Sequence, residues 1–213
     1  LGLLSTLPAV LILSILKPFF WLRIGKLHHT RIGHLALETD IFLRYRQLGR
    51  YHVKPFYFFL CDSRGIANRQ LLTMFQRVLP IYESRVLVAL YDGMLPLLKL
   101  TPFHQPLGLK DIEYYEFNNT KASISLTPEE IQKGSDLLKR MNIDYDNDKY
   151  VCIFARDNAF INETLPHNQK SIQHDIRNSD IDHCIEAVKY LIEKGFSVIR
   201  VGSIVKKPIA WSH

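Results

Sequence analysis

The amino-acid sequence predicts an α/β fold with parallel sheets in two domains. Short apolar runs that suit buried strands alternate with amphipathic stretches of helical period, and a polar, aspartate-rich stretch separates two such series. The second series is the clearer one, because residues 150–203 predict a strand, a long polar loop, a capped helix and a second strand. That order is typical of a right-handed β-loop-α-β unit of a parallel sheet.

Composition limits the classes of function. The 213 residues, 47% of them hydrophobic, suffice for one large domain or two small ones with a true core. The net charge of +6 is mildly basic, but no lysine or arginine run is dense enough for nucleic-acid binding, so an anionic small ligand or a membrane surface fits better. Cys61, Cys152 and Cys184 share no metal or redox spacing and lie in apolar runs, which favours buried, reduced thiols in a cytoplasmic compartment.

The chain begins with an apolar stretch. Residues 1–16 carry no charge and consist mainly of Leu, Ile, Val and Ala, interrupted by Pro8. At about 1.5 Å per residue they are shorter than the roughly 30 Å core of a bilayer, so residues 1–17 are predicted to be part of a membrane segment or a monotopic anchor. A buried N-terminal helix is the alternative. By the positive-inside rule, the basic residues that follow place the remainder at the cytoplasmic face of the membrane. They are Lys17, Arg23, Lys26 and Arg31.

Residues 18–142 are predicted to form the first domain, joined by a linker at 143–149 to a second domain at 150–213. The first domain is expected to contain a strand at 19–24, a turn at 25–30, a helix after residue 34, a strand at 56–61 and a helix at 67–79. The apolar run 86–90 suits either a strand or a buried helix. A last helix begins clearly, with Thr127 as N-cap, Pro128 at N1 and Glu130 at N3.

The sequence RIGH at 31–34 lies where the first strand leads into a helix. Gly33 would let the backbone approach a ligand closely, and Arg31 would add positive charge beside free amide groups. Glu38 and Asp40 are interpreted as acids favoured by the helix dipole. A tight turn with a solvated Arg31 is the alternative.

The connection between the two strands of the second domain is the most unusual feature. It runs from Arg156 to Asn178, whereas strand-to-helix loops usually have about 2 to 6 residues. It also follows the carboxyl end of a parallel strand, which is where open α/β sheets bind ligands. Arg156 and Arg177 could converge there on one anion, with N–H groups of a helix capped by Ser179 as further donors.

Three residues near that anion site could act as acid or base, or orient a hydroxyl group. They are Asp157, His174 and Asp180. The alternative is that Arg156 and Asp157 form an ion pair that ties the loop to the sheet, and that His174 is a surface residue.

Several common signatures are absent from the sequence. It contains no G-x-G-x-x-G, no P-loop, no G-x-S-x-G and no His or Cys cluster with metal-ligand spacing. The D-x-D pattern at 180–182 lies where a helix begins, so capping explains it and we do not assign it to metal binding. We therefore expect no metal and no cofactor.

Four of the motifs together resemble a bacterial family described as glycosyltransferases of surface-polysaccharide loci. They are RIGH at 31–34, RDNAF at 156–160, HDIRNSDID at 174–182 and VIRVG at 198–202. The resemblance covers about residues 18–208. It implies the GT-B fold, in which two Rossmann-like domains face each other and the C-terminal one holds a nucleotide-sugar donor.

The resemblance also implies roles for individual residues. As in GT-B fucosyltransferases, to which the Arg-Asp pair is distantly similar, Arg156 would bind the donor diphosphate with Arg177 beside it. The other residues implied at the donor are Asn178, Ser179, Asp180 and Gly202. Arg31, Gly33 and His34 would line the acceptor side, and His34 joins Asp157 and His174 as a candidate catalytic residue.

The sequence thus leads to a specific expectation of function. We expect a membrane-associated, metal-independent glycosyltransferase of hexosyl or fucosyl type that transfers a sugar from a nucleotide diphosphate to a glycan or lipid-linked acceptor. A non-catalytic nucleotide- or sugar-binding module and a membrane-tethered scaffold of polysaccharide assembly are the alternatives. Since the sequence lacks an initial Met and ends soon after the second strand at 196–201, we also expect a fragment whose C-terminal domain is truncated.

Overall fold

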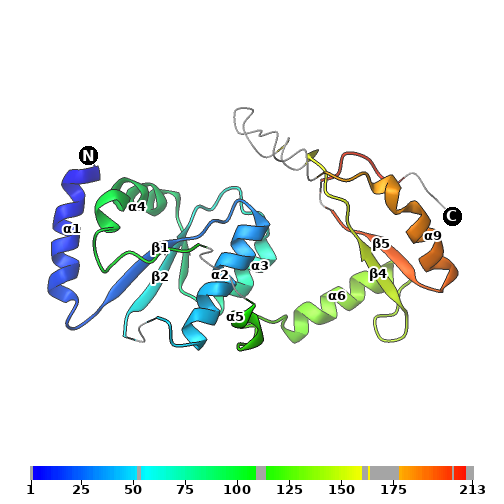
Figure 1. Cartoon of the computed structure of the whole chain (residues 1–213), viewed down its shortest axis with the longest axis horizontal. Coiled ribbons are helices and arrows are strands. Elements are labelled where there is room, and N and C mark those ends of the chain that lie inside the picture. The colour runs from blue at the N-terminus through cyan, green and yellow to red at the C-terminus, as the bar shows by residue number, and fades with distance from the viewer. Residues whose placement is uncertain are drawn as a thin grey trace. The chain divides into compact units, whose positions relative to one another are not determined.

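The protein is divided into two compact units, Leu1–Leu126 and Thr127–His213. The computed structural model, shown in Figure 1, describes residues 2–51, 54–108, 114–159, 163, 178–202 and 204–209. Each unit contains a parallel sheet with at least one helix packed on it, which confirms the predicted α/β class. The finer assignment to two facing Rossmann-like domains stays a prediction.

The first unit is built on a parallel sheet of order β1-β2-β3. Its strands are β1 (Leu22–Lys26), β2 (Phe56–Cys61) and β3 (Ile81–Glu83). Strand β2 has the predicted bounds, whereas β1 begins three residues later than expected and takes in two residues of the predicted turn. Strand β3 was not predicted, because three residues are too few to show a period.

Alternation along β2 directs its side chains into two separate cores. Tyr57, Phe59 and Cys61 pack with α2 (Ile32–Gln47) and α3 (Arg69–Gln76). The intervening Phe58 and Leu60 pack with residues of α1 (Gly2–Leu16) and α4 (Arg85–Leu98). The sheet is therefore covered on both faces, which accounts for the nearly continuous apolar character of β2.

Helix α4 answers whether the apolar run 86–90 is a strand or a helix. Residues 86–90 belong to helix α4, whose N-cap Ser84 accepts a hydrogen bond from the Leu87 amide at 3.3 Å. Helix α1 packs against α4 and reaches the core through Val10 and Leu13.

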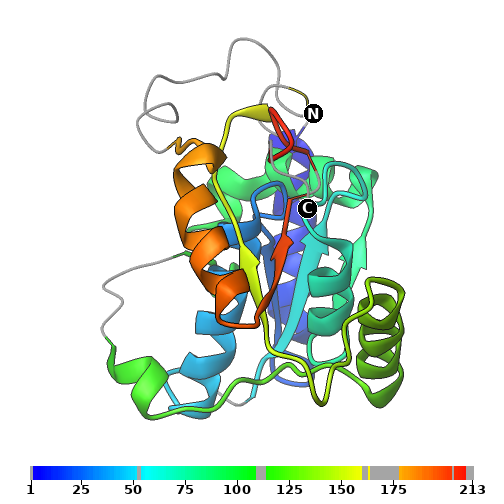
Figure 2. The ribbon, with the colours of Figure 1, turned by 90° about the vertical axis from the view of Figure 1, so that its right-hand side faces the viewer.

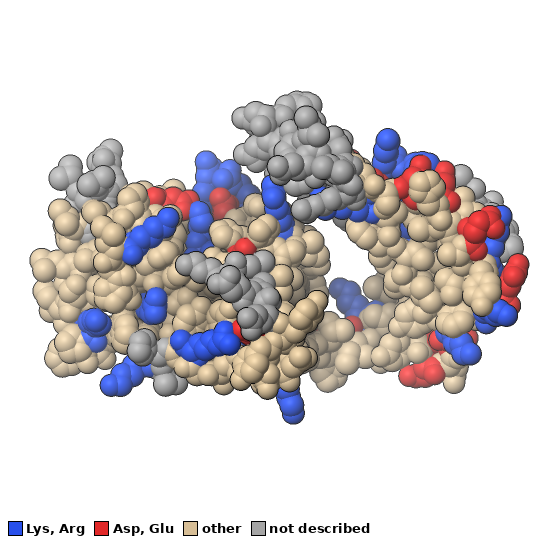
Figure 3. Space-filling model, viewed as in Figure 1, with Lys and Arg blue, Asp and Glu red and all other residues tan. Residues whose placement is uncertain are grey.

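The side of α1 that faces away from the core is exposed. Among the described residues, no helix has both the length and the apolar character needed to cross a membrane. The exposed apolar side chains include Leu7, Leu11 and Ile15. On the face seen in Figure 3, the end of the first unit that carries α1 shows few charged side chains. The predicted buried helix is therefore only partly buried, and the predicted membrane anchor stays a prediction.

The second unit contains α6 (Pro128–Arg140) and the parallel pair β4 (Tyr150–Ile153) and β5 (Ser197–Arg200). Thr127 and Glu130 form the predicted capping box, with Thr127 Oγ1 accepting from the Glu130 amide at 3.2 Å and Glu130 Oε2 accepting from the Thr127 amide at 2.8 Å. Helix α6 thus forms as predicted, but it groups with the second unit, whereas the sequence interpretation assigns it to the first domain.

The predicted helix between β4 and β5 consists of two segments. They are the 3-10 helix η2 (Ile181–Cys184) and helix α9 (Ile185–Glu193), which packs along β5 (Figure 2). Asp180, not Ser179, is the N-cap, since its carboxylate accepts from the Asp182 amide at 3.0 Å. Gly195, with a φ of 78°, follows the end of α9 as predicted.

The cysteines differ in burial from one another. Cys61 is buried, Cys184 is half-buried and Cys152 is exposed. The prediction of three buried thiols is correct for Cys61 and wrong for Cys152.

Candidate functional site

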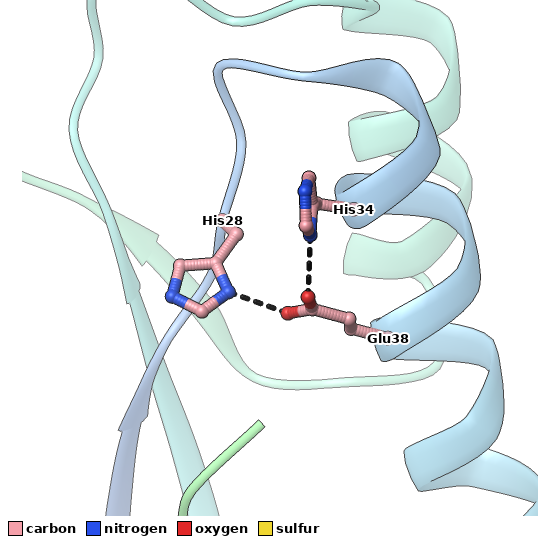
Figure 4. Close-up of side chains that lie close together, drawn as sticks. All are labelled: His28, His34 and Glu38. Carbon is pink, nitrogen blue, oxygen red and sulfur yellow. Dashed lines mark hydrogen bonds and ion pairs between the residues drawn. The ribbon is translucent and has the colours of Figure 1, made fainter. Parts of the chain in front are cut away.

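Two histidines and a glutamate meet at the carboxyl end of β1 and form what we call the imidazole–carboxylate cluster (Figure 4). His28 lies in the connection that follows β1, while His34 and Glu38 lie on α2. Arg31, with extended backbone angles, precedes the first helical residue, so the helix places His34 and Glu38 four residues apart on one face. The turn before α2 brings His28 to the same face.

Both imidazole rings form hydrogen bonds with the same carboxylate, that of Glu38. His28 Nδ1 lies 2.5 Å from Glu38 Oε2, and His34 Nδ1 lies 2.6 Å from Glu38 Oε1. An ionised carboxylate only accepts hydrogen bonds, so both rings carry a hydrogen on Nδ1 in this arrangement. In a neutral ring the lone pair is then on Nε2, the nitrogen that is left to accept a proton.

Burial makes these two hydrogen bonds important. The Glu38 side chain is only 6% exposed, whereas the His28 and His34 side chains are 53% and 45% exposed. A buried carboxylate is costly unless hydrogen-bonded or paired with a cation, and the two imidazoles supply such partners. The neighbouring His29 differs, since it is buried and its ring nitrogens contact the backbone carbonyls of Leu27 and Arg64.

The sequence interpretation of this region needs one correction. The first turn of α2 contains no acidic residue, so the helix dipole does not account for Glu38 or Asp40. Asp40 instead pairs with Arg44 at 2.6 Å. His28, His34 and Glu38 also place potential ligand atoms within 4.8 Å of one another, although the sequence shows no cluster with the usual spacing. The expectation of no metal stays a prediction.

The other two residues of the predicted acceptor side both precede His34 in the sequence. Arg31 and Gly33 are both exposed at the start of α2. A Cβ atom added to Gly33 would meet no atom within 4 Å from elsewhere in the described part of the chain, so packing against those residues does not require glycine there. A close approach by a ligand at Gly33 stays a prediction.

A second site, the β4–β5 pocket, lies at the carboxyl ends of the strand pair in the second unit. It encloses about 430 Å³. Four of its lining residues were candidates from the sequence: Asp157, Asn178, Ser179 and Asp180. Three basic residues of the lining were not: Arg200, Lys206 and Lys207. The only local signal for them is the position of Arg200 at the end of a strand.

Asp157 joins the two chain segments that leave β4 and β5. Its Oδ1 accepts from the Ala159 amide at 2.9 Å, and its Oδ2 accepts from the Lys206 amide at 2.8 Å. Because backbone amides occupy both oxygens, the geometry gives Asp157 a structural task. Its role as acid or base stays a prediction.

Lys207 is held by two carboxylates. Its Nζ lies 2.9 Å from Asp180 Oδ1 and 2.6 Å from Asp182 Oδ2. The Asp182 amide and the Lys207 ammonium lower the pKa of Asp180, while hydrogen bonds to Asp182 and Asp180 raise the pKa of Lys207. An anion in the pocket would therefore compete with these carboxylates for Lys207.

Arg200 supplies a further positive charge beside Lys207. One guanidinium nitrogen, Nη1, donates to the Lys207 carbonyl oxygen at 2.5 Å. Its Nε is buried without a hydrogen-bond partner in the part of the chain that the structure describes.

The remaining predicted donor residues have different places. Arg156 is half-buried next to the pocket, and its carbonyl oxygen accepts from the Ser179 amide at 2.8 Å. Gly202 follows β5 with a φ of 152°, and a Cβ there would lie 2.8 Å from a Val205 methyl carbon. His174 and Arg177 lie outside the described residues, so the convergence of Arg156 with Arg177 stays a prediction.

Comparison with protein-family models, curated proteins and solved structures finds no match to this chain. The chemistry of the two sites therefore follows from their geometry. The cluster presents ring nitrogens that can accept or donate a proton, and the pocket presents basic side chains that can hold an anion.

Proposed function

We propose that the chain is part of a glycosyltransferase that transfers a sugar from a nucleotide diphosphate donor to a hydroxyl group of a glycan or lipid-linked acceptor. The β4–β5 pocket is the observation that carries this proposal. It lies outside the carboxyl ends of parallel strands, where α/β proteins bind nucleotides, and its volume is in the usual range of about 300–1,000 Å³ for ligand sites.

The pocket would hold the diphosphate of the donor. Three basic side chains line the pocket, and only two carboxylates do, those of Asp157 and Asp180. The Asp157 carboxylate already accepts hydrogen bonds from two backbone amides. Lys206 and Arg200 would contact phosphate oxygens directly, and Lys207 would do so by leaving Asp180 and Asp182. Positive charge here stabilises the diphosphate as it leaves. Arg156 is the further ligand that the family resemblance suggests.

The imidazole–carboxylate cluster would supply the base. Nε2 of His34 takes the proton of the acceptor hydroxyl, and the hydroxyl oxygen forms a bond to the anomeric carbon of the sugar. The bond from that carbon to the diphosphate oxygen breaks, and the nucleoside diphosphate leaves with the electron pair. Glu38 stays ionised and stabilises the imidazolium that forms.

The location and partners of this enzyme follow the same proposal. The acceptor is a surface polysaccharide or its lipid-linked precursor, and the reaction takes place at the cytoplasmic face of a bacterial membrane. The exposed apolar side of α1 supports contact with that membrane. The transfer as written requires no metal ion.

Donor binding is the experiment that tests the proposal. Nucleoside diphosphates and their sugars are titrated into the full chain by calorimetry. Lys206→Ala should weaken the affinity for the best donor, while Asp182→Asn should strengthen it by releasing Lys207. Lys189→Ala, on the exposed side of α9, is the control. Equal affinities for all four proteins would overturn the assignment of the pocket.

Turnover separates the enzyme from its alternatives. His34→Ala should lower kcat by about 10²–10⁴-fold while leaving donor affinity unchanged. Tight donor binding without turnover by the wild-type chain on any acceptor supplied would instead favour a non-catalytic binding module.

A further inference from the structure

The imidazole–carboxylate cluster has the composition of a metal site. Two ring nitrogens and a carboxylate oxygen, from His28, His34 and Glu38, lie within 4.8 Å of one another (Figure 4). Two of the three come from one helix face at a spacing of four residues, an arrangement that helices use to bind zinc.

The charge of the site favours a cation. The Glu38 carboxylate is buried, and its partners are two imidazoles that are neutral when each carries one proton. A divalent ion would balance the buried negative charge directly. Because His28 and His34 are about half exposed, solvent could complete the coordination on the open side.

The ligand types select a class of ion. Imidazole nitrogen suits Zn²⁺, Co²⁺ and Ni²⁺, whereas Mg²⁺ and Ca²⁺ prefer sets of oxygen ligands. Two histidines and one glutamate, with an open position, is a ligand set of known zinc sites. We propose that the cluster is a zinc-class site in which His28 and His34 bind through Nδ1 and Glu38 through its carboxylate.

A small rearrangement is enough to admit the ion. Bonds of about 2.0–2.1 Å in a tetrahedron place neighbouring ligand atoms roughly 3.4 Å apart. The present nitrogen-to-oxygen distances of 2.5 and 2.6 Å would each lengthen by about 0.8 Å. The two rings that would turn to make this change are about half exposed.

Metal binding and the proposed base exclude each other. An ion on Nδ1 uses the lone pair of that nitrogen, so the ring hydrogen moves to Nε2 and His34 no longer accepts a proton there. Zinc is therefore an inhibitor of sugar transfer. This consequence depends on the proposed function, whereas the binding of the metal does not.

Cobalt(II) titration of the metal-free full chain tests the site. We expect one equivalent to bind with the visible absorption of a tetrahedral ion, Zn²⁺ to displace it, and Ca²⁺ and Mg²⁺ to have no effect. His28→Ala, His34→Ala and Glu38→Gln should each lower the affinity at least about tenfold. His183→Ala, an exposed histidine of the second unit, is the matched control and should bind as the wild type does.

Two results would overturn the proposal. One is the absence of the cobalt spectrum at one equivalent of metal, and the other is equal binding by the wild type and all three cluster variants. Circular dichroism confirms that each variant is folded, and the two histidine variants keep the test decisive if Glu38→Gln is unstable. Metal binding without loss of turnover would uphold the metal site and refute His34 as the base.

Discussion

Replacing Glu38 by glutamine tests the geometry of the cluster most directly. The substitution keeps the shape of the side chain but exchanges two accepting oxygens for one accepting oxygen and one donating NH₂ group. His28 and His34 both donate from Nδ1 to this side chain, so only one of them can keep its hydrogen bond. The other ring must move its hydrogen to Nε2 or turn away.

The size of the effect follows from burial and charge. A hydrogen bond to a charged group contributes about 1.5–3 kcal/mol, and competition from water at the half-exposed rings reduces this amount. The glutamine also removes a buried negative charge, and the desolvation cost that is thereby avoided offsets part of the lost hydrogen-bond energy. We expect the free energy of unfolding of the first unit to fall by about 1–2 kcal/mol, and its Tm by about 5 °C.

Nitrogen-15 NMR of histidine-labelled, metal-free chain at pH 8 measures the result. In the wild type both rings of the cluster should carry hydrogen on Nδ1, and in Glu38→Gln one of them should carry it on Nε2. Glu186→Gln, on the exposed side of α9, is the control for replacing a glutamate. Unchanged ring tautomers together with an unchanged Tm would refute the shared bonding of both rings to Glu38.

Three further predictions concern single residues. Gly25→Ala should destabilise the first unit by about 2–3 kcal/mol in urea unfolding, because the new Cβ would lie 2.7 Å from the backbone oxygen of Gln105. Gly33→Ala is the comparison and should change the unfolding free energy by less than about 0.5 kcal/mol, because the described residues leave space for a Cβ there. The pKa of Asp180 is lower in the folded chain than the value of about 3.9 expected in the unfolded chain, so Asp180 contributes stability that is lost as the pH falls through its folded-state pKa. Asp180→Asn should therefore flatten the acid side of a plot of unfolding free energy against pH. An unaltered plot would contradict this. Burial raises the pKa of Cys61 to about 12, so a thiol reagent at pH 8 should label exposed Cys152 first, and equal rates would count against the packing of β2.

Local signals predicted the elements that local interactions determine. Strand β2 has the expected bounds because its apolar run is bordered by turn residues, and α6 begins at Thr127 because its cap and Glu130 bond each other. The parallel order of β4 and β5 also followed from the sequence, since a helix between two strands requires a crossover. Where several caps compete, as at Ser179 and Asp180, the sequence alone chose wrongly.

The tertiary structure decided how the sites are assembled. His34 and Glu38 share a helix face, but the turn that joins His28 to them depends on how β1 and α2 pack, which no spacing rule contains. Similarly, Lys206 meets Asp157 because parallel pairing aligns the carboxyl ends of β4 and β5. Sequence by itself determined an α/β chain with charged and polar residues after its strands. Contacts between distant segments determined which of those residues share a site, because sheet register and helix packing set the distances.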